Sequence, residues 1–150
     1  MKRIFWLLLI ILLIFAGCTS DESVADGPQI DPNLVTVEVM GASNKSISIK
    51  ITNNSDMQLF YGEPYFLEYF ENGKWETVEE RAEGNFFYMV AYGIMPGKST
   101  VWSANLEQRY GALSDGRYRI LKHVDFQNDM GEKCAEQQIS AEFEVSVRER

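Results

Sequence analysis

The sequence predicts an all-β domain, an antiparallel sandwich of about seven or eight short strands, which follows a leader that targets the chain for export. Two observations predict the fold. Apolar and polar residues alternate along several short stretches, and turn residues such as Gly, Pro, Asn and Asp separate these stretches. A third observation, an uncharged apolar run behind a basic start, predicts the leader.

The alternation is clearest at the two ends of the domain. Val alternates with polar residues or Met over residues 35–40, and Ile alternates with Ser, Lys and Thr over residues 47–52. Residues 139–147 repeat the pattern near the end of the chain. Each of these strands is therefore expected to bury one face and to leave the other in water.

Further strands are expected in the middle of the chain, where aromatic residues gather, at residues 65–70, 74–79, 86–94, 99–102 and 117–124. The first two are expected to form a hairpin, because Asn72-Gly73 suits the positive φ angles of a tight turn. Residues 105–110 predict one or two helical turns, with Asn105 as the N-cap and Gly111 at the end.

The first 17 residues predict a lipoprotein signal peptide. Lys2 and Arg3 precede an uncharged apolar run, Ile4–Ala16, which is too short to cross a bilayer as a helix. The following Phe15-Ala16-Gly17-Cys18 resembles the lipobox of bacterial lipoproteins, although Phe15 stands where Leu is usual. The resemblance implies that a diacylglycerol on Cys18 anchors the mature chain to a membrane. An uncleaved anchor and a buried apolar helix are the alternatives.

A flexible tether is expected at residues 18–33, which are polar, acidic and interrupted by Pro and Gly. The folded domain is expected at residues 34–150. The whole chain carries a net charge of −8, and loss of Lys2 and Arg3 with the leader brings it to about −10. Because such a surface repels phosphate, nucleic acid is not an expected partner, and the lipid must provide the membrane attachment.

The stretch Leu113–Tyr118 narrows the fold class further. Tyr118 follows a Gly turn at the start of a late strand, which resembles the tyrosine corner of immunoglobulin-like sandwiches. An ordinary strand tyrosine is the alternative. The two immunoglobulin cysteines are absent, and Ile49 and Ile120 are expected at the equivalent inner positions.

Several short motifs together resemble a bacterial immunoglobulin-like domain found in lipoproteins of Gram-positive bacteria. The resemblance covers residues 34–147 and rests on Asn53-Asn54-Ser55, Tyr61-Gly62, Tyr65-Phe66-Leu67-Glu68, Asn72-Gly73-Lys74-Trp75, Met95-Pro96-Gly97-Lys98-Ser99, Tyr110-Gly111 and Leu113–Ile120. It implies an Ig-like sandwich in the cell envelope and no catalytic residue.

No motif predicts an enzyme, a metal site or a cofactor. His123 is the single histidine, with no ligand residues at zinc spacing, and no serine lies in a Gly-x-Ser-x-Gly motif. Asp125–Gln137 is expected to be a long solvated loop, and calcium binding is the less favoured alternative, because the loop matches a calcium loop only in part. Cys134 in this loop is expected to be solvent-facing, with a free thiol or an intermolecular bridge as further readings.

The aromatic stretch suggests a binding surface. Neighbouring residues in a strand point to opposite faces, so paired aromatics such as Tyr65-Phe66 cannot all enter one core. We expect Tyr61, Tyr65, Tyr69 and Tyr88 to include a patch that binds an envelope protein, with sandwich core as the alternative. The expected function is therefore a non-catalytic binding or structural module, anchored on the extracytoplasmic face of the cell membrane. An envelope protease inhibitor or sensor subunit and, less favoured, a small hydrolase are the alternatives.

Overall fold

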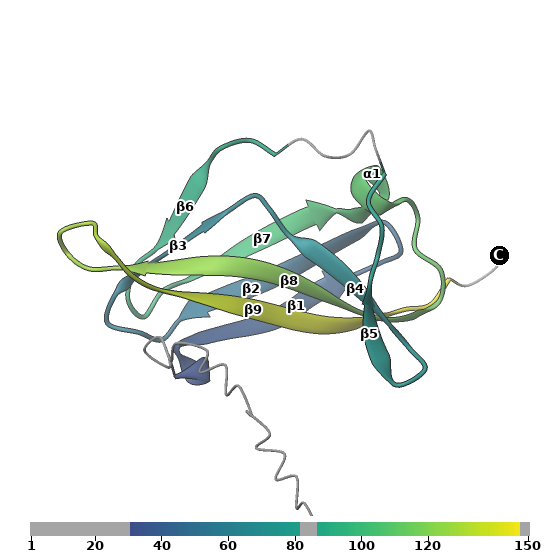
Figure 1. Cartoon of the computed structure of the whole chain (residues 1–150), viewed down its shortest axis with the longest axis horizontal. Helices are drawn as coiled ribbons and strands as arrows, with labels where there is room; N and C mark the ends of the chain where they lie inside the picture. Colours follow the sequence, from purple (N-terminus) through teal and green to yellow (C-terminus); the bar gives the residue numbers. More distant parts are fainter. Residues whose placement is uncertain (1–30, 82–86, 148–150) are drawn as a thin grey trace, which may run out of the picture.

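Two antiparallel β-sheets packed face to face form the domain in a computed structural model that describes residues 31–81 and 87–147 (Figure 1). The elements run in the order η1 (Pro32–Leu34, one 3₁₀ turn), β1 (Val35–Ala42), β2 (Ser46–Asn53), β3 (Gln58–Gly62), β4 (Phe66–Glu71), β5 (Lys74–Thr77), β6 (Ala91–Ile94), β7 (Ser99–Asn105), α1 (Leu106–Tyr110), β8 (Gly116–Gln127) and β9 (Lys133–Val145). The prediction of an all-β, Ig-like sandwich is confirmed.

The smaller sheet has three strands in the order β1-β2-β7, and the larger has six, β5-β4-β8-β3-β6 with β9 on the far side of β8. β3 and β4 lie end to end along one side of β8, because β3 pairs with residues 124–127 and β4 with residues 118–121. β9 pairs with the whole length of β8 on the other side. The long β8–β9 hairpin is therefore the element that connects the strands of the larger sheet.

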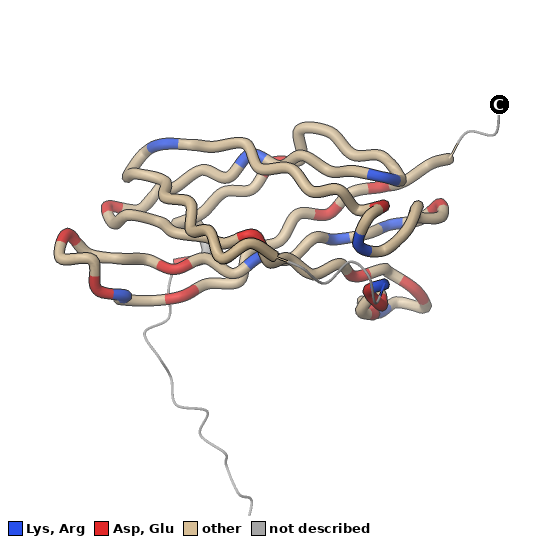
Figure 2. The backbone as a smooth tube through the Cα atoms, turned by 90° about the horizontal axis from the view of Figure 1, so that it is seen from above, with Lys and Arg blue, Asp and Glu red and all other residues tan. Residues whose placement is uncertain are grey.

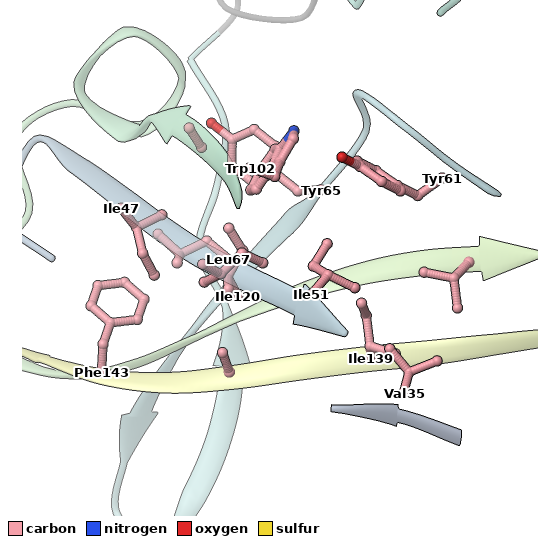
Figure 3. Packing of buried hydrophobic residues seen from close by; sticks show 14 of the residues in the cluster. Val35, Ile47, Ile51, Tyr61, Tyr65, Leu67, Trp102, Ile120, Ile139 and Phe143 are labelled. Carbon is pink, nitrogen blue, oxygen red and sulfur yellow. The ribbon is translucent and has the colours of Figure 1, made fainter. Parts of the chain in front are cut away.

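The core lies between the sheets and follows the predicted alternation (Figure 3). Ile47, Ile49 and Ile51 of β2 are buried against residues of the larger sheet, among them Ile120 and Phe143. Burial of each such aliphatic side chain contributes roughly 1.5–3 kcal/mol relative to exposure. Ile49 and Ile120 are both fully buried, as expected for the inner positions that cysteines hold in immunoglobulins.

The tyrosine corner predicted at Tyr118 is confirmed. Its ring is buried and stacks on Phe143 with centroids 5.8 Å apart, and its hydroxyl donates a hydrogen bond to the Ser114 backbone oxygen at 3.1 Å. The hairpin turn is also confirmed, since Asn72 and Gly73 have φ angles of 52° and 81°. Asn105 caps α1 by accepting from the Gln108 amide, as predicted.

Two expectations need correction, and one strand was not predicted. Asp125–Gln137 is not a long loop, because β8 continues to Gln127, β9 starts at Lys133, and a short turn joins them. The stretch 86–94 is a strand only over Ala91–Ile94, and residue 86 lies outside the described residues. The sequence reading did not anticipate β3, whose five residues lie in a run of mixed aromatic and polar character.

The backbone in Figure 2 shows the positions of Lys and Arg (blue) and of Asp and Glu (red) spread over the domain rather than gathered in one region. The described residues contain no helix long and apolar enough to cross a membrane. The predicted leader, the lipidation site Cys18 and most of the tether lie outside the described residues.

Candidate functional site

The four tyrosines predicted to form a binding patch do not share one surface. Tyr61 and Tyr65 are buried in the core, because the register of β3 and the turn that follows it point both rings between the sheets. Tyr69 is half-buried against the Tyr118 ring, with centroids 5.0 Å apart. Tyr88 is 82% exposed. The four-tyrosine patch is therefore corrected to one exposed residue, and partner binding by it stays a prediction.

Two of these tyrosines, Tyr65 and Tyr88, nevertheless line one groove, which runs along the edge of β7 opposite to β2. The groove has a volume of about 200 Å³ and is lined by Glu63, Tyr65, Phe87, Tyr88, Trp102, Ser103, Ala104, Asn105, Gln108 and Arg109. β7 and α1 supply one wall, and residues that precede β4 and β6 supply the other. We refer to it as the β7 groove.

Tyr65 fixes the base of the β7 groove. Its ring packs edge-on against Trp102 and Phe87, with centroids 5.3 and 6.0 Å away, and its hydroxyl donates to the Asn105 backbone oxygen at 3.3 Å. Burial raises the pKa of the Tyr65 phenol, with a smaller contribution from the neighbouring Tyr110. The phenol therefore stays neutral and remains a hydrogen-bond donor at physiological pH.

Arg109 of α1 closes one end of the groove. Its guanidinium lies 3.9 Å from the centroid of the Phe87 ring and forms an ion pair with Glu80. The Arg109 backbone oxygen also accepts from the Arg81 amide at 2.8 Å, so α1 is joined to the segment that follows β5. Within the described residues, Nε and Nη1 of this buried side chain have no hydrogen-bond partner.

The charged groups at the groove are the Arg109–Glu80 pair, Glu63 and the buried ammonium of Lys122. Glu80 neutralises the Arg109 charge inside the protein, whereas Glu63 has no basic ion-pair partner among the described residues. The Tyr92 hydroxyl donates to the Glu63 carboxylate, and this hydrogen bond is the largest cause of the raised Tyr92 pKa. The groove thus presents aromatic rings, a carboxylate and amide groups, but no arrangement of nucleophile and base.

Lys122 is a buried cation that was not predicted as a site residue. It lies on β8 opposite the gap between β3 and β4, and its ammonium donates to the backbone oxygens of Gly62 at 2.8 Å and Pro64 at 3.2 Å. The same ammonium lies 3.8 Å from the centroid of the Trp102 ring. Burial lowers the pKa of Lys122 to about 7, while nearby Glu63 acts in the opposite direction. Lys122 therefore has a structural role, holding the β3–β4 turn onto β8.

His123, the next residue, faces the other way. Its side chain is exposed on the outer face of the larger sheet, edge-on to Phe66 with ring centroids 6.4 Å apart. It borders a shallow hollow of about 280 Å³ that also contains Phe60 and Asp125. Nothing in this hollow combines the imidazole with a serine or cysteine nucleophile, so the geometry gives no support to the hydrolase alternative.

The acidic residues near the β8–β9 turn form ion pairs rather than a cation cage. Lys133 contacts Asp125 at 2.9 Å and Glu136 at 2.6 Å. Over residues 31–81 and 87–147, no group of three or more His, Cys, Asp or Glu side chains could hold a metal ion. Cys134 is solvent-exposed, as expected, and its Sγ donates to the Glu132 backbone oxygen at 3.4 Å.

Comparison with known proteins agrees with the class that the topology and tyrosine corner define, an Ig-like β-sandwich. The family model described as "Bacterial Ig-like domain" matches residues 34–144. The chain therefore belongs to the bacterial Ig-like domain family, as the sequence motifs indicated.

Among solved structures, the chain is similar to the archaellum periplasmic stator protein FlaG from Sulfolobus acidocaldarius. The two share 14% identity with a TM-score of 0.39, over 73% of this chain and 100% of FlaG. No curated protein matches this sequence. A likeness at this level carries no information about the function of the chain.

Proposed function

We propose that this chain is an exported, lipid-anchored Ig-like module that binds a protein of the cell envelope and performs no catalysis. One observation carries the proposal. The domain that matches the bacterial Ig-like family starts at residue 34, after a lipobox-like motif that ends at Cys18 and a polar linker. This order of parts supports a folded domain held by a tether outside the cytoplasm.

The anchoring part of the proposal rests on the lipobox-like Phe15-Ala16-Gly17-Cys18. Signal peptidase would cut before Cys18, and the thioether lipid would hold the mature domain, residues 34–150, on the extracytoplasmic face of the membrane. Residues 18–33 would act as the spacer. A polar chain of this length spans roughly 20–25 Å on average if it behaves as a flexible coil.

Metabolic labelling with an alkyne fatty acid tests the anchor, and the chain offers a matched control in its second cysteine. Cys18→Ala should abolish labelling and release the protein from the membrane fraction. Cys134→Ala should label and fractionate as the unaltered chain does. Normal labelling of Cys18→Ala, or loss of labelling in Cys134→Ala, would contradict the proposal.

A binding role is supported by the family, which is a type of non-catalytic module, and by the chemistry of the β7 groove. Its aromatic walls and the exposed Tyr88 suit protein recognition, because tyrosine and tryptophan offer large contact area at low entropic cost. The protease-inhibitor alternative required a long inserting loop at Asp125–Gln137. The short β8–β9 turn gives that alternative no support.

Site-specific photo-crosslinking in intact cells tests the binding role. A photoreactive phenylalanine analogue at Tyr88 should form a discrete adduct with an envelope protein. The same analogue at Met40, which is also exposed but lies on β1, serves as the control and should form none. Absence of an adduct at position 88, or equal adducts at both positions, would count against partner binding at the groove.

A further inference from the structure

β7 differs from every other strand with an open side among the described residues. An edge strand presents unpaired backbone groups to other chains, and most proteins protect such edges with charges, bulges, proline or short length. β7 is seven residues long, pairs with β2 without a bulge, and carries no charged residue and no proline. The other open strands are each protected: β1 by Glu38 and a bulge, β5 and β6 by a length of four residues, and β9 by four charged side chains.

The register identifies which backbone groups of β7 are unpaired. The Asn53 amide donates to the Lys98 oxygen at 2.9 Å, so this pair is a hydrogen-bonded one. Hydrogen-bonded and non-bonded pairs alternate along an antiparallel ladder. The regular pairing that follows therefore directs the N–H and C=O groups of Thr100, Trp102 and Ala104 toward β2. Those of Ser99, Val101 and Ser103 point away from the sheet.

Among the described residues the place beside β7 is vacant, and it has the position of a strand in related sandwiches. Constant-type immunoglobulin sheets have four strands, with the fourth beside the strand that corresponds to β7. Here the sheet has three, and β5 and β6 both belong to the opposite sheet. Among the described residues, no strand pairs with β7 on its outer side.

The β7 groove gives this edge a chemical preference. Ser103 and Asn105 line it, and the exposed ring of Tyr88 lies in the same groove as the carboxylate of Glu63. The faces of Trp102 and Tyr65 are already occupied by Lys122 and Arg109. Arg109 adds no free positive charge, because Glu80 pairs with it. Aromatic faces next to a carboxylate attract a cation. An incoming strand is therefore expected to place a basic side chain in the groove.

From these observations we propose that β7 is a strand-addition site, at which an extended peptide of a partner protein becomes the fourth strand and inserts a Lys or Arg into the β7 groove. Main-chain hydrogen bonds to Ser99, Val101 and Ser103 hold the peptide, and the groove selects its side chain. Seven paired residues span about 23 Å. The inference rests on the proposed binding function and specifies where and what the module binds.

The test uses a phage-displayed library of random twelve-residue peptides, selected on the purified lipid-free domain with its tether, residues 19–150. Enriched peptides should alternate β-branched residues with others and share one basic residue. Val101→Pro removes an outward N–H from an exposed edge position, where proline is tolerated, and should weaken binding of a synthetic enriched peptide at least tenfold. Val101→Thr keeps the N–H and is the matched control, so its affinity should change less than twofold.

Two further measurements distinguish the contribution of main-chain hydrogen bonds from that of the side chain in the groove. Every second backbone N–H of a paired peptide points toward β7. Methylation of these nitrogens should abolish binding, whereas methylation of the intervening nitrogens should leave binding unchanged. Glu63→Gln should weaken the peptide about three- to fivefold, but leave unchanged a variant peptide with norleucine in place of the basic residue. Thermal melts of each protein variant establish that the fold is retained.

Failure of this proposal is distinguishable from failure of the proposed function. A selection that yields no binder, or binders insensitive to Val101→Pro, would overturn strand addition, while the crosslinking at position 88 would still decide whether the module binds a partner. Sedimentation that shows a dimer lost in Val101→Pro would overturn the peptide proposal in favour of a second copy. Binding of glycan fragments instead of peptides would overturn it as well.

Discussion

β1 and β7 are the two edges of the same three-stranded sheet, yet their outer sides are built in different ways. β1 carries a charged pair with its neighbour, Glu38 with Lys50 at 3.3 Å, and a bulge between Val39 and Gly41. β7 carries Ser, Thr, Val, Trp, Ala and Asn in an unbroken register. Met40 on β1 and Val101 on β7 are about equally exposed, so exposure alone does not distinguish the two edges.

The difference lies in what each edge offers another chain. Charges and bulges discourage a new strand, whereas a regular uncharged edge beside an aromatic groove accepts one. The domain is acidic overall, with a net charge of −8 for the whole chain. An uncharged seven-residue strand in such a protein is therefore a specific feature of β7, and variants can test its consequences.

The largest expected effect is a difference in stability loss between core-facing substitutions on β7 and on β1. Trp102→Ala should lower the free energy of unfolding by about 3–5 kcal/mol, because Trp102 is buried, packs on Tyr65 and lies over Lys122. Val37→Ala on β1 should cost less than about 1.5 kcal/mol, since Val37 is only half-buried. Urea denaturation measures both values. Equal losses would show that the two edges contribute alike to the core.

The next effect is a pH dependence that involves β7 through Lys122. Its pKa is about 7 in the folded protein, below the ordinary value of 10.5 that applies to the unfolded chain. Between these values the unfolded chain binds more protons, so stability increases with pH. The free energy of unfolding should rise by about 2 kcal/mol from pH 7.5 to 9.5.

Urea melts across that pH range measure this rise. Lys122→Met should flatten the profile, whereas Lys98→Met, at an exposed lysine, should keep it. An unchanged profile in Lys122→Met would mean that another group is responsible. The range stops at pH 9.5 because ionisation of the tyrosines, whose pKa values burial raises at Tyr61 and Tyr65, acts in the opposite direction at higher pH.

A smaller effect is expected away from both edges. Tyr118→Phe removes the tyrosine-corner hydrogen bond to the Ser114 oxygen and should cost about 1 kcal/mol. Peptide binding at β7 should be unaffected, because the corner lies at the start of β8. Calorimetry and a binding titration on one sample check both statements. Loss of binding at full stability would mean that the recognition site extends beyond the β7 groove.

The smallest effect is expected on β1 itself. Glu38→Gln removes one partner of an exposed ion pair and should change stability by less than about 0.5 kcal/mol. It also leaves the bulge as the main protection of this edge. Sedimentation at high protein concentration should still show a monomer. Self-association of Glu38→Gln would show that the charge, rather than the bulge, protects β1.

The sequence was informative wherever local chemistry determines the structure. Alternation predicted β1, β2 and the end of β9, Asn72-Gly73 predicted a turn, and the Gly-Arg-Tyr run at residues 116–118 predicted the corner. These features depend on neighbours in the chain. Burial of Tyr61 and Tyr65 was not predicted, because it depends on how β3 and β4 pair with a strand some 60 residues away.

Two buried cations, Lys122 and Arg109, differ in whether the sequence indicates their burial. Lys122 lies in phase with Ile120 and Val124, so the period of two already assigned it to the inner face. Its partners, the carbonyls of the β3–β4 turn, exist only in the folded protein. The burial of Arg109 could not be predicted from periodicity, because its helix has only five residues. Its ion pair with Glu80 joins residues that are brought together only by the fold.

Amide hydrogen exchange by NMR, measured on the domain alone and saturated with an enriched peptide, tests the central claim most directly. Strand addition at β7 predicts an alternation: the amides of Ser99, Val101 and Ser103 exchange fast in the free protein and become protected in the complex. Those of Thr100, Trp102 and Ala104 should be slow in both states, because β2 already accepts them. Unchanged fast exchange at Val101 and Ser103 with peptide bound would contradict the claim.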